Sequence, residues 1–261
     1  MRRRQALLAL VAGAGAAGCA ALRARFPGPD APFVATPENV TVEMLRLAAV
    51  TPADAVFDLG SGDGRVVIAA ARDFGAHGVG VEIDPNLIAT SRDAAAAAGV
   101  AARVTFLWQD LFVTDLTGAT VVTIYLTQEV NLRLRPKLLR ELAPGARVVS
   151  HQFDMGDWEP DRVVNVRGRE RGYRLYFWRI PANAVGTWRS RVGDGDAATL
   201  TLAQRFQKLT GTLGDQPVAG RVDGEHVEVM GGGLALRGVV HGDAIDGEAA
   251  GAHWRALRMP Q

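Results

Sequence analysis

Short apolar runs alternate with helical patterns between residues 36 and 180. The segments "AVFDLG", "GVGVEID", "RVTFLWQD", "TVVTIYL" and "ARVVSHQF" predict strands, because each is short and rich in β-branched or aromatic residues. Between them, "GRVVIAAARDFG", "PNLIATSRDAAAAAGV" and "NLRLRPKLLREL" have helical spacing. The segments "DRVVNVR" and "RLYFWRI" predict an antiparallel pair at the sheet edge. Residues 31–182 are therefore expected to form a Rossmann-like α/β domain with a seven-stranded, doubly wound sheet.

The pattern changes near residue 183. Residues 184–261 contain many glycines and short alternating runs, such as "TLTLAQRF" and "GRVDGEHVEVM". The dipeptide Asp223-Gly224 stands between two such runs, which is a strong hairpin signal. We expect a small all-β domain of five or six antiparallel strands, a barrel or a sandwich, with "GTW" (186–188) in its first strand and "HWRAL" (253–257) in its last.

The first 25 residues have the layout of a targeting segment. Three arginines precede an uncharged stretch from residue 6 to residue 22, and charge resumes at Arg23. This order is typical of an export signal, and Arg3-Arg4 resembles a twin-arginine signal. The segment "AAGC" (16–19) resembles a lipobox, in which Cys19 would be lipidated. We expect an export signal, a lipoprotein signal or a membrane anchor, and a location in the cell envelope or periplasm. The alternative is the cytoplasm or the cytoplasmic face of the membrane.

Charge and composition exclude several functions. The formal net charge is +1, so no overall basic field favours nucleic acid as a partner. Cys19 is the one cysteine of the chain, which excludes an intrachain disulfide and a cysteine nucleophile in the folded body. The five histidines are scattered and form no pair at metal-ligand spacing, so we expect no metal site.

The segment "VFDLGSGDGR" (56–65) predicts a ligand-binding turn after the first strand of the sheet. Glycines at this place let a backbone approach a ligand closely. The spacing is G-x-G-x-G rather than the G-x-G-x-x-G of dinucleotide-binding proteins, and Asp58 would repel a pyrophosphate. The loop therefore favours a ligand with a positive centre and an amino group. Its candidate binding residues are Asp58, Gly60, Ser61, Gly62 and Gly64.

Two more carboxylates follow at the ends of the next two predicted strands. Glu82 ends "GVGVE", where a carboxylate can bind both hydroxyls of a ribose. Asp110 follows "RVTFLWQ", where it could accept a hydrogen bond from an adenine amine while Leu111 packs on the ring. Asp84 is assigned to the N-cap of the helix that begins at Pro85.

The segments "DLGSGDGR", "GVGVEIDP" and "DLF" resemble the motifs of class I S-adenosylmethionine-dependent methyltransferases. Within that superfamily, "DLGSGDGRVVIAAA", "VEIDPNLIATSR", "DLFVTDL" and "PGARVVS" are similar to the protein-lysine methyltransferases that modify mitochondrial carriers and a component of ATP synthase. The segments "YLTQEVNLRLRPKLLREL" and "SHQFDMGDWEPD" are more similar to bacterial relatives of that group. The resemblance implies a methyltransferase that uses S-adenosylmethionine as methyl donor and a protein lysine as acceptor. A small-molecule amine or hydroxyl acceptor stays open.

The acceptor is expected to meet the methyl group at the end of the fourth strand, "YLTQEVN". Tyr125, Gln128 and Asn131 are polar groups that could orient an amine there, and His151 at the end of the fifth strand is a candidate base. The residues leave two other functions open. One is a non-catalytic S-adenosylmethionine-binding module with the C-terminal domain as the unit that binds a ligand or partner. The other is a nicotinamide enzyme, which the glycine spacing and Asp58 disfavour.

Overall fold

A computed structural model describes residues 31–168 and 171–260 of the chain. The predicted leader, with Arg3-Arg4 and Cys19, lies outside the described residues. In the part that is described, no helix has both the length and the apolar character that crossing a bilayer requires.

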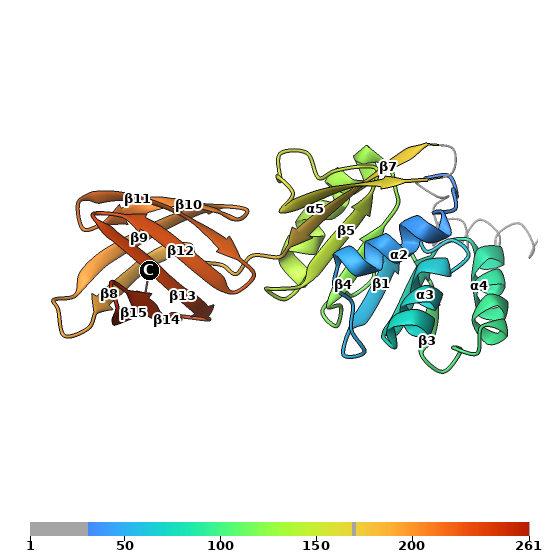
Figure 1. Ribbon diagram of the computed structural model, residues 1–261, viewed down its shortest axis with the longest axis horizontal. Helices are drawn as coiled ribbons and strands as arrows, with labels where there is room; N and C mark the ends of the chain where they lie inside the picture. The colour runs from blue at the N-terminus through green and yellow to red at the C-terminus, as the bar shows by residue number, and fades with distance from the viewer. Residues whose placement is uncertain (1–30, 169–170, 261) are drawn as a thin grey trace, which may run out of the picture.

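The first domain is built on a sheet of seven strands in the order β3-β2-β1-β4-β5-β7-β6, which confirms the expected doubly wound α/β domain (Figure 1). The first five strands are parallel to one another, whereas β7 pairs antiparallel with both β5 and β6. The strands are β1 (Ala55–Leu59), β2 (His77–Glu82), β3 (Val104–Trp108), β4 (Val121–Ile124), β5 (Arg147–His151), β6 (Arg162–Arg167) and β7 (Gly172–Arg179).

Two hydrophobic layers enclose this sheet. Leu134 and Leu138 pack with Trp178 on one face, and Met44 and Leu45 pack with Ala70 on the other.

Local signals set the limits of the helices. The first turn of α4 is capped by Asp84, which accepts a hydrogen bond from the Asn86 amide at 2.8 Å, as predicted. The helices are α2 (Glu38–Leu47), α3 (Arg65–Phe74), α4 (Pro85–Ala97) and α5 (Gln128–Glu141).

The strand order places a switch point beside β1. The chain runs outward from β1 to β2 and β3, then returns to β4 on the other side of β1. Loops that leave the carboxyl ends of β1 and β4 therefore diverge, and open α/β sheets bind ligands in the crevice that forms there. The predicted site residues all lie at or near the carboxyl ends of β1 to β5.

The second domain is a closed barrel of eight antiparallel strands, in the order β10-β11-β12-β13-β14-β15-β8-β9. The expectation of five or six strands was too low, because left-handed glycines such as Gly214, Gly224 and Gly242 divide the sequence into more hairpins than alternation alone indicates. The strands are β8 (Gly186–Val192), β9 (Ala198–Arg205), β10 (Lys208–Leu213), β11 (Gln216–Asp223), β12 (His226–Gly231), β13 (Leu234–His241), β14 (Ala244–Ala249) and β15 (Ala252–Arg258).

Pairing of the first and last strands closes the barrel. β15 pairs with β8, so the strands expected at "GTW" and "HWRAL" lie side by side. Trp188 and Trp254 fill the interior, and the Trp254 indole donates to the Ser190 hydroxyl at 2.9 Å. Apolar side chains therefore occupy the barrel axis.

Polar contacts hold the barrel against the α/β domain. The Ala182 amide donates to the Gly224 carbonyl at 2.7 Å. The segment before β6 is acidic, and three of its carboxylates form ion pairs with barrel residues: Asp157 with Arg205, Glu159 with Lys208 and Asp161 with Arg221. Figure 1 shows the barrel at one end of the molecule, and the start of the described chain at the other.

Candidate active site

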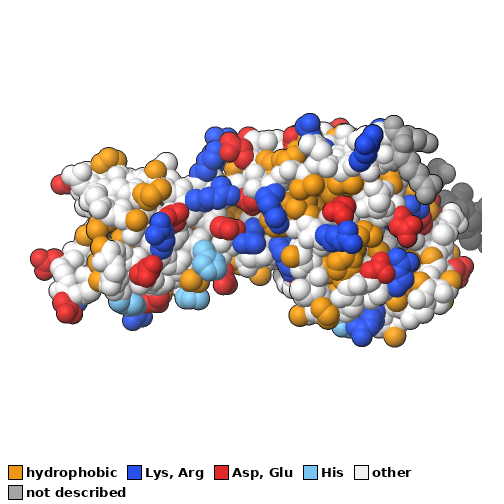
Figure 2. Space-filling view, viewed as in Figure 1, with side chains coloured by type: hydrophobic (Ala, Val, Ile, Leu, Met, Phe, Trp, Pro, Cys, Tyr) orange, Lys and Arg blue, Asp and Glu red, His pale blue; other side chains and the backbone are white. Residues whose placement is uncertain are grey.

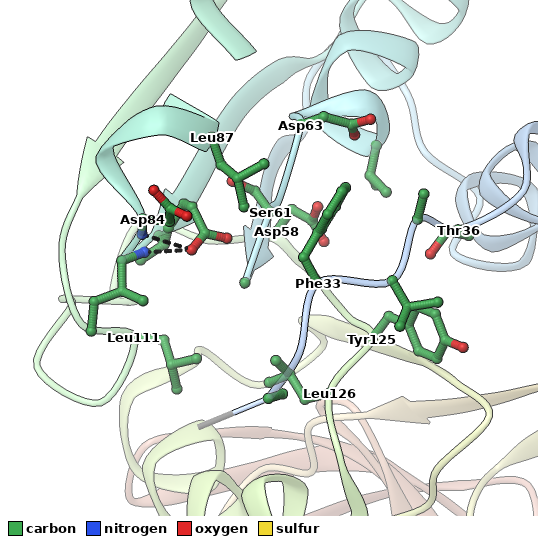
Figure 3. Close-up of a pocket in the computed structure, with 18 of the residues that line it drawn as sticks. Phe33, Thr36, Asp58, Ser61, Asp63, Asp84, Leu87, Leu111, Tyr125 and Leu126 are labelled. Atoms are coloured by element: carbon green, nitrogen blue, oxygen red, sulfur yellow. Dashed lines mark hydrogen bonds between the residues drawn. The ribbon is translucent and has the colours of Figure 1, made fainter. Parts of the chain in front are cut away.

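A cavity of about 180 Å³ lies at the carboxyl ends of β1, β2 and β4 (Figure 3). Its walls come from the glycine loop after β1, the end of β2, residues 109–111 after β3, residues 125–126 after β4, and residues 31–36. The structure thus brings together four segments that the sequence identified, together with one that it did not.

The glycine loop has a backbone that only glycine adopts without strain. The φ angles of Gly60, Gly62 and Gly64 are 78°, 54° and 77°, in the left-handed region. The amides of Gly60 and Ser61 both donate to the Val81 carbonyl at 2.9 Å, which fixes the loop on β2. The Ser61 hydroxyl oxygen is buried and has no hydrogen-bond partner within residues 31–168 and 171–260. Because buried polar atoms are normally paired, this oxygen is available to a ligand.

Glu82 lies at the end of β2 with its carboxylate facing the glycine loop. One carboxylate oxygen accepts a hydrogen bond from the Gly62 amide at 2.9 Å. The other accepts from the Ile83 and Asp84 amides at 2.7 and 2.9 Å. Three backbone donors therefore fix the orientation of this carboxylate, and the residue is 8% exposed and lines the cavity.

Asp58 is a buried carboxyl group that lines the cavity. The Thr123 hydroxyl donates to it at 2.7 Å. Burial raises the pKa of Asp58 to about 7, and the nearby charges of Glu82 and Asp63 add to this effect. A buried carboxylate with carboxylate neighbours is stabilised by a cation, so this end of the cavity favours a positively charged ligand.

Asp110 and Leu111 form the wall after β3. One Asp110 oxygen accepts from the Phe112 amide at 2.8 Å, which holds the carboxylate at the edge of the cavity. Leu111 and Ile83 line the same region and give it an apolar surface. A hydrogen-bond acceptor beside apolar side chains suits a flat heterocyclic ligand that carries an exocyclic amine.

The segment 31–36 is the part of the site that sequence reasoning missed. Phe33 lies over the glycine loop in Figure 3, and the Thr36 carbonyl accepts from Arg65 at 2.8 Å. Arg65 is the one cation among the described residues that line the cavity, and it also pairs with Asp63. No residue of "APFVAT" belongs to a binding motif, so only tertiary packing could place this segment here.

Tyr125 and His151 are adjacent, but only Tyr125 lines the cavity. The two ring centroids are 3.8 Å apart, and His151 is fully buried with its Nδ1 3.3 Å from the Thr36 hydroxyl. Burial, and the nearby charge of Arg171, lower the pKa of His151 to about 4. A histidine in this setting is a poor base for an ammonium group, and its ring packs against the Tyr125 ring instead of lining the cavity.

Gln128 and Asn131 do not line the cavity. The Gln128 amide donates to the Asp154 side chain at 2.7 Å. Asn131 is fully buried, and its amide donates to the Ser150 hydroxyl and the Phe153 carbonyl, each at 3.1 Å. Both side chains hold the segment after β5 against α5, in place of the contact with the acceptor that we expected.

The cavity fits S-adenosylmethionine as a ligand. The carboxylates of Asp58, Glu82 and Asp110 line one cavity, which suits a ligand that carries a cation, a ribose diol and an exocyclic amine. The unpaired Ser61 hydroxyl can form a hydrogen bond with a polar chain of the ligand, and the glycine loop lets that chain approach the backbone closely. A pyrophosphate would instead meet several carboxylates and one cation that is already paired. Over the described ranges, no group of three or more His, Cys, Asp or Glu residues is arranged to hold a metal ion.

Comparisons with known proteins agree with this ligand. Residues 58–162 match the family model described as the ANTKMT methyltransferase domain. A protein-lysine N-methyltransferase of Saccharolobus islandicus is 42% identical over 153 residues, which cover 58% of this chain and 95% of that protein. The adenine nucleotide translocase lysine N-methyltransferase of Mus musculus is 37% identical over 133 residues, which cover 51% of this chain and 58% of that protein. The chain thus spans less than two thirds of the length of the mouse relative.

A solved structure also resembles the α/β domain. It is described as an RNA methyltransferase from Salinibacter ruber in complex with S-adenosyl-L-homocysteine. It is 53% identical to this chain with a TM-score of 0.55, and the match covers 57% of this chain and 95% of that one. The matches to the Saccharolobus islandicus and Salinibacter ruber proteins are shorter than this chain. The difference is about the combined length of the barrel and the leader.

Proposed function

Because this chain belongs to the family of class I S-adenosylmethionine-dependent methyltransferases that includes the protein-lysine N-methyltransferase of Saccharolobus islandicus, we propose that its methyl acceptor is the ε-amine of a protein lysine. The assignment of the binding site rests on one observation: Asp58, Glu82 and Asp110 lie at the ends of three adjacent strands around a glycine loop. The names of the relatives support lysine as the acceptor.

The residues of the site bind and align the two reactants. S-adenosylmethionine, when bound, supplies a methyl group on a positively charged sulfur. Asp58, Glu82 and Asp110 hold the donor in one orientation, and Phe33 covers the glycine loop from the solvent side. Tyr125 lies at the end of β4, where its ring can direct an incoming amine along the line of attack. Alignment of this kind supplies much of the rate enhancement in a direct displacement.

The attacking amine has to lose its proton before it reacts. A lysine amine in water has a pKa of about 10.4, and His151 is too weak a base and too deeply buried to take that proton. Loss of the proton to solvent is therefore the simplest route. We expect the rate of methyl transfer to rise with pH up to at least about pH 9.

Radiolabelled methyl transfer tests the acceptor class directly. The full chain is incubated with methyl-labelled S-adenosylmethionine and three acceptors: synthetic peptides with one lysine each, the same peptides with arginine in its place, and mixed-sequence RNA. Label confined to lysine peptides, with methyl-lysine found by mass spectrometry, supports the proposal. Label in RNA would favour the activity named for the Salinibacter ruber protein. No transfer to any acceptor, with the donor still bound, would favour the non-catalytic binding module.

We propose further that the leader (1–25) attaches the protein to a membrane of the cell envelope. The three arginines, the uncharged stretch 6–22 and the lipobox-like "AAGC" support this location. Alkaline phosphatase fused after residue 30 tests its topology. An active fusion places the body outside the cytoplasm, and an inactive one places it on the cytoplasmic face, where S-adenosylmethionine is made.

A further inference from the structure

The start of the described chain is also a wall of the active-site cavity. Residues 31–36 line it, and Phe33 and Val34 are 52% and 53% exposed. The uncharged stretch of the leader ends at residue 22, so only residues 23–30 separate it from the cavity wall. Eight residues span at most about 28 Å when fully extended. A leader held in a membrane would therefore keep the cavity close to the lipid surface.

Three exposed arginines stand beside this segment, and we name Arg167, Arg171 and Arg174 the arginine rim. They lie at the end of β6 and the start of β7, next to the carboxyl end of β5. None of the three forms a salt bridge with a carboxylate of residues 31–168 or 171–260. Their positive charge is therefore available to an anionic partner.

Contacts place the arginine rim and the segment 31–36 on one side of the molecule. The Arg167 carbonyl accepts from Asn39, which lies in the first turn of α2, at 3.0 Å. Arg171 lies over the Tyr173 ring at 5.0 Å, and Tyr173 packs edge-on against His151, the partner of Thr36. Through these contacts the rim lies near Thr36, which lines the cavity.

The barrel lies away from this side. β7 begins at Gly172, beside the rim, and ends at Arg179, which pairs with Asp223 of the barrel. A strand of eight residues is about 26 Å long. Figure 1 shows the same separation, with the barrel and the start of the described chain at opposite ends of the long axis, and Figure 2 shows the molecular surface from the same side. The barrel therefore leaves the rim open.

We propose that the arginine rim binds the anionic headgroups of a lipid membrane. Residues 23–30, as a short tether to the leader, and the rim then together hold the mouth of the active site against the bilayer. The barrel then projects away from the lipid. The inference rests on membrane attachment of the leader and not on the identity of the methyl acceptor. A basic residue near an anionic surface strengthens binding about fivefold, so three arginines would fix the orientation of a protein that the leader already holds at the surface.

Hydrogen exchange of the full chain in vesicles tests this orientation. The chain is reconstituted into phosphatidylcholine vesicles with and without phosphatidylglycerol, and flotation first confirms that it stays with the lipid. The anionic vesicles should slow exchange by about fivefold or more in peptides that cover 31–36 and 162–174, and leave the barrel peptides unchanged. β6 is suited to this readout because it is the edge strand of the sheet.

Matched charge reversals separate the effect of the rim on exchange from the effect of the protein's net charge. Arg167→Glu with Arg174→Glu should abolish the slowing, whereas Arg189→Glu with Arg191→Glu on the barrel should preserve it. Methyl transfer to soluble lysine peptides should be unchanged in both variants, so failure of the rim is distinguishable from failure of the proposed function. Equal slowing in both kinds of vesicle, slowing that survives the rim reversal, or a chain that does not float would overturn the proposal. Slowing at the rim by mixed-sequence RNA instead of vesicles would overturn it in favour of a nucleic-acid partner.

Discussion

The Phe33 ring lies directly against the backbone of Gly62. A Cβ atom added at Gly62 would come within 2.3 Å of the ring, closer than any real contact of this kind. The two residues are 29 positions apart in the chain, and Phe33 lines the cavity beside the glycine loop (Figure 3). The glycine loop is therefore fitted to residues 31–36 as well as to the ligand.

Gly62→Ala should weaken binding of S-adenosylmethionine by about tenfold or more, because the methyl group displaces Phe33 and strains the loop. Gly99→Ala is the matched control. Gly99 also has a left-handed φ, 71° against 54° for Gly62, but nothing lies within 4 Å of its added Cβ. It should lose about 1 kcal/mol of stability and no affinity. Isothermal calorimetry and thermal unfolding of both variants check the two effects.

The double variant Gly62→Ala, Phe33→Ala separates the two causes. If collision with Phe33 dominates, removing the ring should restore most of the lost affinity. If the double variant binds as poorly as Gly62→Ala alone, backbone strain dominates and the proposed fit between Phe33 and the loop is wrong.

The pKa of Asp58 predicts a pH dependence of donor binding. The pKa is about 7 without ligand, and a bound cation favours the ionised form. Binding at pH 6 should therefore release a proton, and affinity should fall by up to about tenfold per pH unit below pH 7. Calorimetry in buffers of different ionisation enthalpy measures that proton. Asp58→Asn should bind more weakly and release none, and an unchanged release in this variant would contradict the assignment.

The sequence predicted those parts of the site that depend on strand ends. The carboxyl ends of parallel strands meet at one edge, so Asp58, Glu82 and Asp110 could be placed together once the strands were recognised. His151 was correctly placed beside this edge. Its burial could not be predicted, because it depends on packing by Tyr125, Tyr173 and Thr36 from three other segments.

Tyr125 is predicted to orient the acceptor. Tyr125→Ala should lower kcat by about tenfold to a hundredfold while leaving donor affinity within about twofold, because alignment of the amine is lost. Tyr125→Phe keeps the ring and should retain most activity. Tyr176→Ala is the control, since Tyr176 is also half-buried but stacks on Trp178 outside the cavity. Equal losses in the Tyr125 and Tyr176 alanine variants would point to folding rather than orientation.

The barrel shows where pattern reading is weakest. Alternation and the Asp223-Gly224 turn indicated an all-β domain of five or six strands, whereas the structure has eight strands that close into a barrel through β8 and β15. That closure depends on a pairing between residues 186–192 and 252–258, which no local signal encodes.

Asp54 should make a large contribution to the stability of the α/β domain. It is buried, forms an ion pair with Arg147, and accepts from the Thr51 amide at 2.8 Å and from the Thr120 hydroxyl at 2.7 Å. Asp54→Ala should cost about 3 kcal/mol because it leaves a cation and a hydroxyl without their partner. Glu43→Ala breaks the exposed pair with Arg46 and should cost about 0.5 kcal/mol or less. Urea unfolding measures both.

The sign of the pH effect at Asp54 follows from its pKa. Burial alone would raise this pKa, but the hydrogen bonds from Thr120, Thr51 and Arg147 lower it below 3.8. The folded state therefore holds this proton less tightly than the unfolded state. The contribution of Asp54 is fully present above the unfolded pKa and is lost as the pH falls below about 4. The difference in stability between the wild type and Asp54→Asn should shrink over that range.

The most direct test of the central claim is a calorimetric titration of S-adenosylmethionine into the full chain and two glutamate variants. Glu82→Ala removes the carboxylate that three backbone amides fix at the cavity. Glu129→Ala removes an exposed carboxylate outside it. We predict binding by the wild type and Glu129→Ala, and a loss of about tenfold to a hundredfold in Glu82→Ala. Equal affinity in all three proteins would contradict the site described here.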